Sequence, residues 1–247
     1  MLKIFLAKDF YYLQSLGVTA KRHHHAAPQI SLVGPTDKLI WDSEQGDGLF
    51  FPAECPHAVE SSGKLHTFFL SPVHPAARAM ADRTQPKGFF NPPEEVRKQL
   101  SQLELLPESG TALRQNLDSL LQSLVEPQEY ADPLDERIQE VVNHIDGLEQ
   151  KRIAAEDLAE QIALSESRFL HLFKEEMKMT VRKYLLWTRV LDGARRVAQG
   201  ESITEAAHAT GFTDSAHFAR SFKKMFGLTL SGALGSEANL QLVMELS

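Results

Sequence analysis

The first 75 residues contain short apolar runs separated by turn-forming sequences. The runs are Gln29–Val33, Leu39–Trp41, Leu49–Phe51 and His66–Leu70. The sequences between them include Gly34-Pro35, Gly46-Asp47-Gly48 and Ser61-Ser62-Gly63. Apolar and β-branched runs bounded by such turns are typical of strands. Several short strands at regular spacing favour a small barrel or sandwich.

From Pro92 the apolar residues recur every three or four positions, which is the period of a helix. One stripe consists of Leu113, Leu117, Leu120, Leu121 and Leu124, and a shorter one of Val96, Leu100 and Leu103. The polar, proline-containing segment 126–133 then reads as an interdomain linker. A further stripe consists of Leu134, Ile138, Val141, Ile145 and Leu148. The pattern stays helical, with short breaks, as far as Phe226.

These patterns predict an α+β protein with a small β-barrel followed by helices. We expect the barrel at 1–90, linking helices and a linker at 91–132, an all-α domain at 133–235 and a tail of unknown role at 236–247. The leucine stripe around Leu117 is wider than a two-helix hairpin needs for its own packing. We expect that stripe to form a homodimer contact; the alternative is that it packs on the barrel.

Composition narrows the class of protein. The chain has 247 residues, 43% hydrophobic and 24% charged, which is ordinary for a globular protein. No apolar stretch approaches the ~18 residues of a membrane-spanning helix, so no membrane partner is expected. The single cysteine, Cys55, excludes an internal disulfide, and a reducing compartment, the cytoplasm, is expected.

Charge is uneven along the chain. The net charge of −7 argues against a nucleic-acid partner for the molecule as a whole. However, Arg168–Arg196 carries 8 basic and 3 acidic residues, a net of +5, and Ala216–Leu228 carries 3 basic residues and no acid. The local balance therefore favours a polyanionic partner for the C-terminal region.

An internal repeat falls in that basic region. Four residues, Phe169, Phe173, Lys174 and Thr180, match Phe218, Phe222, Lys223 and Thr229 at an offset of 49. Each copy follows a short helical pattern with a small residue, Ala159 or Ala207, and then a turn at Ala163-Leu164 or Gly211-Phe212. The small residue lets two helices pack closely, and the residue after the turn fills the joint. This arrangement predicts two helix-turn-helix units.

The outward faces of the second helices suit the major groove of DNA. At 100° per residue, the phenylalanines of each repeat point inward. The residues on the opposite, outward side of each helix are small, polar or basic, and we expect no acidic residue on these outward faces. Small residues allow close approach, Arg or His reads base edges, and Lys contacts phosphate. The expected DNA-binding residues are Ser167, Arg168, Leu170, His171 and Lys174 in the first unit, and Ala216, His217, Ala219, Arg220 and Lys223 in the second.

A long amphipathic segment, 181–199, joins the two units. About 19 helical residues span roughly 28 Å, which approaches the ~34 Å of one turn of duplex DNA. Residues 159–229 resemble the DNA-binding domain of AraC-type transcription regulators. The resemblance rests on Ile203–Ala207, Gly211-Phe212 and His217–Gly227, with Tyr184-Leu185, Arg189 and Ala194 in the joining helix. It extends over about 100 residues, from near Leu134, and implies sequence-specific promoter binding.

The chain departs from the family pattern at three places. Ala163 and Lys178 stand where the family often has glycine, and Leu230 occupies a usual proline. We therefore expect the last helix of the family to be altered.

The N-terminal region resembles the paired motifs of the cupin barrel. Gly17 precedes His23, His25 and Gln29, and Gly46-Asp47 precedes Pro52-Ala53 and Pro56-His57. The resemblance implies that His23, His25 and His57 face the barrel interior and could bind a divalent metal. In a strand, His23 and His25 share a face. Gln29 replaces the family's glutamate and is a weaker ligand, so the same residues are also expected as a metal-free effector pocket.

The leading hypothesis is a ligand-responsive transcription regulator, not an enzyme, with an activator role among its expected properties. Its expected partners are promoter DNA, a small-molecule effector, a second copy of the chain and RNA polymerase. One alternative is a metal-dependent cupin enzyme with an appended DNA-binding domain. Another is an adaptor whose helical repeats bind protein. A protein-binding groove usually carries large apolar anchors, whereas Leu170 is the only large apolar residue near the outward faces.

Overall fold

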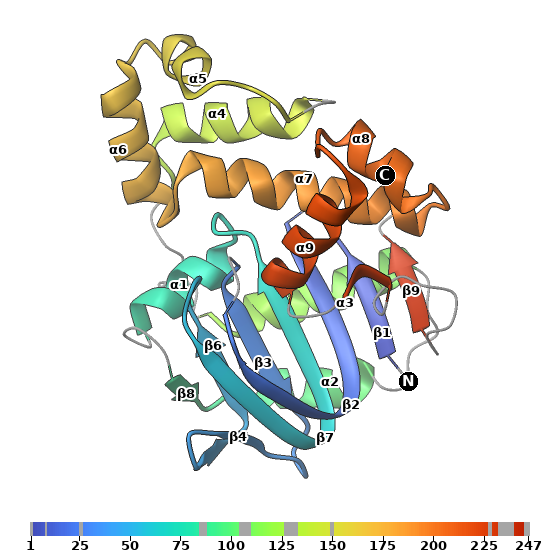
Figure 1. Ribbon diagram of the computed structural model, residues 1–247. Coiled ribbons are helices and arrows are strands. Elements are labelled where there is room, and N and C mark those ends of the chain that lie inside the picture. Colours follow the sequence, from blue (N-terminus) through green and yellow to red (C-terminus); the bar gives the residue numbers. More distant parts are fainter. Residues whose placement is uncertain are drawn as a thin grey trace. The chain divides into compact units, whose positions relative to one another are not determined.

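A computed structural model describes residues 2–7, 9–24, 27–83, 88–103, 110–125, 133–148, 151–226, 229–231 and 240–244. The chain forms two compact units (Figure 1). The N-terminal unit comprises Met1–Ala131 together with Phe226–Ser247, and the helical unit comprises Asp132–Met225. The predicted α+β class is confirmed.

One sheet organises the N-terminal unit. Its described strands are β1 (Leu2–Leu6), β2 (Phe10–His23), β3 (Gln29–Val33), β4 (Leu39–Trp41), β5 (Glu44–Gly46), β6 (Gly48–Phe51), β7 (His57–Leu70), β8 (Gly88–Phe90) and β9 (Leu240–Met244). The strand order is β8-β6-β3-β7-β2-β1-β9, and β4 pairs with both β5 and β7. Neighbouring strands are antiparallel except for β1 and β9, which run parallel.

The sheet curls around a small apolar core. Buried side chains of β3, β4, β6 and β7 form this core, and Val18 of β2 and Phe89 of β8 pack against it. Because β2 and β8 are separated by three strands in the strand order, their contact with one core shows that the sheet is strongly curved. Strands β3 and β4 begin and end where the sequence predicted, and the predicted strand 66–70 is the final part of β7.

Three helices cover the other face of this sheet. They are α1 (Pro75–Arg83), α2 (Glu94–Leu103) and α3 (Gly110–Ser123), of which α2 and α3 are seen behind the strands in Figure 1. Leu117, Leu120, Leu121 and Leu124 are at most 1% exposed, in one cluster with Phe68 of the sheet. The prediction that this stripe forms the homodimer contact is therefore wrong, because the leucines are already buried against their own barrel.

Ion pairs fix both linking helices to the sheet. Arg97 of α2 donates to Asp47 at 2.5 Å, and Arg114 of α3 donates twice to Asp9, at 2.8 and 3.2 Å. Lys38 and Arg97 beside Asp47 lower the pKa of that carboxyl group. Each pair therefore joins a helix to a turn between two strands of the sheet.

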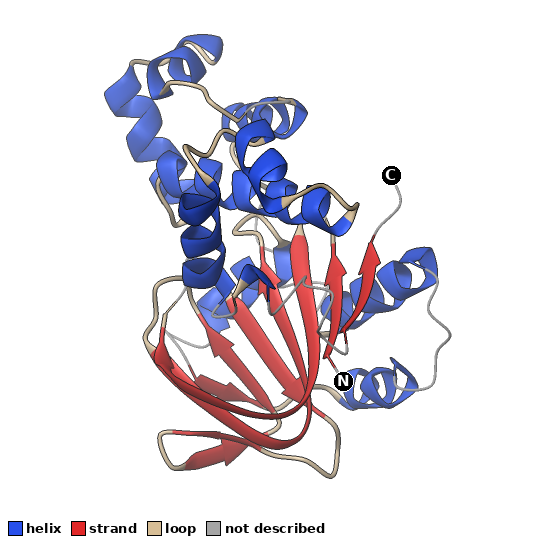
Figure 2. Cartoon of the chain, turned by 45° about the vertical axis from the view of Figure 1, so that its right-hand side comes forward, coloured by secondary structure: helices blue, strands red, loops and turns tan. Residues whose placement is uncertain are grey.

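The helical unit contains α4 (Glu136–Gly147), α5 (Ala155–Gln161), α6 (Glu166–Met177), α7 (Val181–Ala198) and α8 (Ile203–Ala209), and α9 (Ser215–Phe226) as far as Met225. Figure 2 shows that this part of the chain is helical throughout its regular structure. No helix in the described parts of the chain is both long and apolar enough to cross a membrane.

Candidate DNA-binding surface

Helices α5 and α6 form the first helix-turn-helix unit. Ala159, 1% exposed, sits where the two helices meet. The chain turns at Ala163, whose φ is 54°. The N–H of Leu164 then donates to the carbonyl of Ala159 at 2.9 Å. This bond closes the turn and directs the chain into α6, as the small residue and following turn predicted.

Helices α8 and α9 repeat this construction. Ala207 is fully buried, and the N–H of Phe212 donates to its carbonyl at 2.9 Å. Gly211 takes the left-handed turn position with φ 82°. Its carbonyl accepts from Arg152 Nε and Nη2 at 3.1 and 2.9 Å. Arg152 was not predicted from the sequence, because no local pattern indicates a hydrogen bond to a carbonyl 59 residues away.

The two units differ by one residue in the turn. Ser165 caps α6, accepting from the N–H of Arg168 at 3.4 Å. Asp214 accepts from the N–H of His217 at 2.6 Å at the start of α9, and this bond lowers the pKa of Asp214. Equivalent residues of the two units are therefore 48 positions apart up to the turn and 49 positions apart after it. The difference arises because Thr213 has no counterpart in the first unit.

Helix α7 connects the units through the core of the domain. Its Gly193 lies against α9, where a Cβ would come within 2.7 Å of the Phe218 ring.

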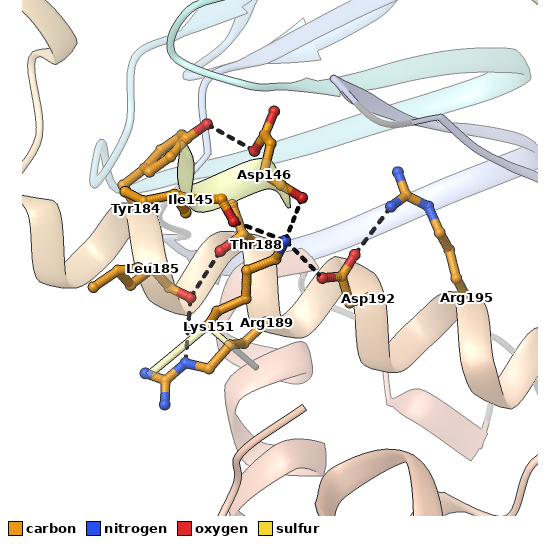
Figure 3. A network of polar contacts seen from close by, with 9 residues as sticks. All are labelled: Ile145, Asp146, Lys151, Tyr184, Leu185, Thr188, Arg189, Asp192 and Arg195. Carbon is orange, nitrogen blue, oxygen red and sulfur yellow. Dashed lines mark hydrogen bonds and ion pairs between the residues drawn. The ribbon is translucent and has the colours of Figure 1, made fainter. Parts of the chain in front are cut away.

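Figure 3 shows a polar network beside α7, centred on Lys151. The Lys151 ammonium donates to the carbonyls of Ile145 and Asp146 at 2.9 and 2.8 Å, and lies 3.4 Å from Asp192. The network joins the end of α4 to the middle of α7, the helix that connects the two units.

The predicted reading residues are at the surface, as the helical periodicity required. Phe169 and Phe173 of α6, and Phe218 and Phe222 of α9, are fully buried. The exposed residues of the predicted set are Ser167, Arg168, Leu170, His171, Lys174, Ala216, Arg220 and Lys223, and His217 and Ala219 are half-buried. Leu170, 37% exposed, is one of three exposed large hydrophobic residues in the described parts of the chain.

One expectation about these faces is wrong. The outward face of α6 was expected to carry no acid, but Glu175 lies on it. Its carboxylate Oε2 is 3.9 Å from His171 Nε2, and both side chains are mostly exposed. The equivalent position of α9, at an offset of 49, is Lys224, so only α9 presents a purely basic surface.

His217 is held in place by its neighbours on the second unit. Thr213 Oγ1 lies 3.2 Å from its Nδ1, and the Phe212 ring meets the imidazole edge-on, with centroids 5.2 Å apart. The imidazole is therefore oriented before any DNA contact, whereas Arg220 stands exposed one turn further along α9.

Only part of the predicted histidine set comes together in the N-terminal unit. His23 and His57 are partners across β2 and β7, and their ring centroids are 4.4 Å apart. His57 contacts the Cys55 carbonyl through Nδ1 at 2.8 Å and stacks on Phe51. His25 lies outside the described residues.

The described residues do not form a metal centre. Gln29, the residue at the cupin glutamate position, donates to Ser31 Oγ at 2.8 Å. Within the described ranges, no group of three or more His, Cys, Asp or Glu side chains could hold a metal ion. Because His25 lies outside the described residues, the three-histidine metal set stays a prediction.

Comparison with known proteins agrees with this geometry. A family model described as a helix-turn-helix domain matches residues 158–234. A 70-residue stretch is 41% identical to the HTH-type transcriptional activator RhaS of Pectobacterium atrosepticum, covering 28% of this chain and 25% of that protein. The C-terminal region is an AraC-type DNA-binding domain. Its two helix-turn-helix units are therefore the DNA-binding elements of a transcription regulator.

The similarity to known proteins extends beyond the DNA-binding domain. The probable transcriptional regulator LumQ of Photobacterium leiognathi is 26% identical over 234 residues, covering 89% of this chain and 94% of that protein. The crystal structure of a ToxT variant from Vibrio cholerae has the same fold, with a TM-score of 0.56 and 11% identity over 91% of this chain and 96% of that one.

Two of the departures from the AraC-type pattern, Ala163 and Lys178, fall where a helix ends. Ala163 and Lys178, which replace frequent glycines, both have left-handed φ values, 54° and 53°. The backbone therefore keeps the family geometry without the residue that suits it best. Leu230, in place of the usual proline, is 2% exposed, and beyond Ser231 the next described element is β9, paired with β1.

Proposed function

We propose that this protein is an effector-responsive transcription regulator whose helices α6 and α9 enter successive major grooves of DNA. The observation that carries this proposal is the pair of similarly built helix-turn-helix units on one rigid helix. Helix α7 has 18 residues and therefore spans about 27 Å. This length is close to the ~34 Å of one duplex turn.

Each predicted residue has a role in this proposal. Arg220 reads a base, with guanine as its best bidentate partner, and His171 reads at the equivalent position of the first unit. Leu170 contacts a thymine methyl group. Lys174 and Lys223 bind phosphate, and Arg168 and His217 flank the base-reading positions. Small side chains at Ser167, Ala216 and Ala219 allow close approach to the groove.

The N-terminal unit is proposed as the sensor of a small molecule near His23 and His57. Support comes from the buried, partly polar surroundings of His57 and from the fold shared with ToxT, whose structure with an unsaturated fatty acid bound has a TM-score of 0.54 and 12% identity. His25 and Gln29 belong to the proposed site through sequence position. Regulation of this kind requires binding and no catalysis.

Three further properties belong to the proposal. We expect the regulator to act in the cytoplasm, where promoter DNA lies, and to contact RNA polymerase when it activates transcription. We also expect it to bind DNA as a homodimer. The leucines of α3 are excluded as the contact, so another surface must form it.

The test is selection of bound duplexes from a random DNA pool. The full chain is used with and without small molecules extracted from cells, and with an unsaturated fatty acid as a defined probe. We expect one enriched sequence with two half-elements about one helical turn apart, and affinity that falls with salt. Enrichment of no sequence would overturn DNA reading, and identical affinity with every small-molecule fraction would overturn sensing.

A further inference from the structure

The two recognition helices carry opposite charge. Helix α6 has two basic residues, Arg168 and Lys174, against three acids, while α9 has three basic residues and no acid. The three acids are Glu166, Glu175 and Glu176. DNA attracts basic surfaces and repels acidic ones whatever the base sequence. The two helices therefore differ in their sequence-independent attraction for DNA.

Only one of these acids stands among the reading residues. Glu166 begins α6. Glu176 is half-buried and accepts from the backbone N–H of Asp135 at 3.2 Å. Glu175, by contrast, has a side chain 65% exposed. At 100° per residue it lies about 40° from His171, on the side toward Arg168, and therefore inside the arc of the proposed DNA contacts.

Glu175 also contacts the central reading residue of its helix. The 3.9 Å separation from His171 joins residues one turn apart on α6. A carboxylate at this position favours a ring orientation in which Nε2 faces Glu175. Nδ1 is then the ring nitrogen left for a base edge.

We propose that Glu175 is a specificity-determining residue of the first helix-turn-helix unit, a proposal that rests on the DNA-binding function above. Its negative charge opposes contact with phosphate, so α6 contributes little affinity for DNA of arbitrary sequence. Its carboxylate also positions His171, so α6 engages where the base edge matches. Helix α9, with Lys224 at the equivalent position, supplies the sequence-independent attraction.

The experiment compares Glu175→Lys and Glu175→Gln with the unaltered chain. Affinity is measured on the enriched duplex and on a scrambled duplex, over a series of salt concentrations. For Glu175→Lys we expect roughly threefold to tenfold tighter binding to the scrambled duplex and a salt slope steeper by about 0.9. Glu175→Gln should gain less affinity and leave the slope nearly unchanged. In both variants we expect weaker discrimination at the base pair that loses selectivity in His171→Ala.

Glu140→Lys is the matched control, since it makes the same charge change on an exposed residue of α4. An equal gain in Glu140→Lys and Glu175→Lys would overturn the proposal, because the effect would then be one of net charge. Unchanged discrimination in both Glu175 variants would also overturn it. If the unaltered chain enriches no sequence, the proposed function fails instead, so the two failures are distinguishable.

Discussion

At the scale of single residues, the two equivalent positions His171 and Arg220 have different surroundings. His171 is paired with Glu175, while Arg220 is exposed and, in the described parts of the chain, has no hydrogen bond or ion pair. The charge of Arg220 helps to lower the pKa of Asp214, but a guanidinium without a hydrogen bond to the described residues can present both of its parallel N–H groups to a guanine. Arg220 is therefore the strongest candidate for the proposed base-reading residue.

Arg220→Ala is expected to weaken binding to the enriched duplex by about 1–3 kcal/mol and to relax the preference at one base pair. Arg220→Lys is the control, because it keeps the charge and loses the two-pronged geometry. The measurement is affinity for a set of duplexes substituted at each position in turn. A loss of equal size on all duplexes would mean that Arg220 contacts phosphate.

The left-handed turn residues give a test of stability. Ala163→Gly removes the steric conflict of a Cβ at φ 54°, and we expect the helical unit to gain about 1 kcal/mol. Gly211→Ala should lose at least as much, because the new Cβ would lie 3.0 Å from Arg152 Nε. Denaturant unfolding measures both. Ala159→Gly, inside helix α5, is the control and should lose about 1 kcal/mol. A loss in Ala163→Gly would contradict this reading of the turn.

At the scale of elements, the sequence was informative where one pattern has one structural explanation. The run Gln29–Val33 lies between turn signals and forms β3 over those residues. Strand β2 was missed, because its second half alternates exposed and half-buried residues around Gly17. The stripe of α3 predicted burial correctly but could not reveal the partner, since leucines on a helix face suit a barrel wall as well as a second subunit.

The same limit applies to the candidate sites. The repeat located both recognition helices, because buried phenylalanines fix the helix phase. Glu175 was overlooked among the outward-facing residues of α6, and its contact with His171 draws attention to it. Arg152 and Lys151 donate hydrogen bonds to backbone carbonyls. Every residue has a carbonyl, so the sequence does not indicate which one accepts such a bond.

Helix α3 gives a prediction at this scale. Leu121→Ala should cost the N-terminal unit about 2–5 kcal/mol, because Leu121 is fully buried in the cluster shared with the sheet. Gln122→Ala, at an exposed position of the same helix, is the control and should cost little. Denaturant unfolding and size-exclusion chromatography together measure stability and assembly. Unchanged stability with conversion of a dimer to a monomer would restore the leucine stripe as a dimer contact.

At the scale of the whole molecule, regulation requires that the N-terminal unit report its state to the chain that follows it. Ligand binding near His23 and His57 would act on strands β2 and β7. Helices α2 and α3 are tied to the same sheet by Asp47–Arg97 and Asp9–Arg114, and they precede the helical unit in the chain. The effect on DNA affinity cannot exceed the difference in effector affinity between the two states.

His57 provides the test of this coupling. It is 1% exposed, stacked on Phe51 and adjacent to His23, so an effector near the imidazoles would contact it. We expect His57→Gln and His57→Ala to keep DNA affinity without effector nearly unchanged and to lose the change that the effector causes. By linkage, these variants should also lose the reciprocal effect of DNA on effector affinity.

Fluorescence anisotropy with labelled DNA, with and without the active fraction, measures the DNA affinity, and calorimetry measures the effector affinity. Circular dichroism confirms that each variant is folded. His24→Ala, at an exposed position beside the site, is the control and should respond normally. A normal response in folded His57 variants would place the sensing site elsewhere in the N-terminal unit.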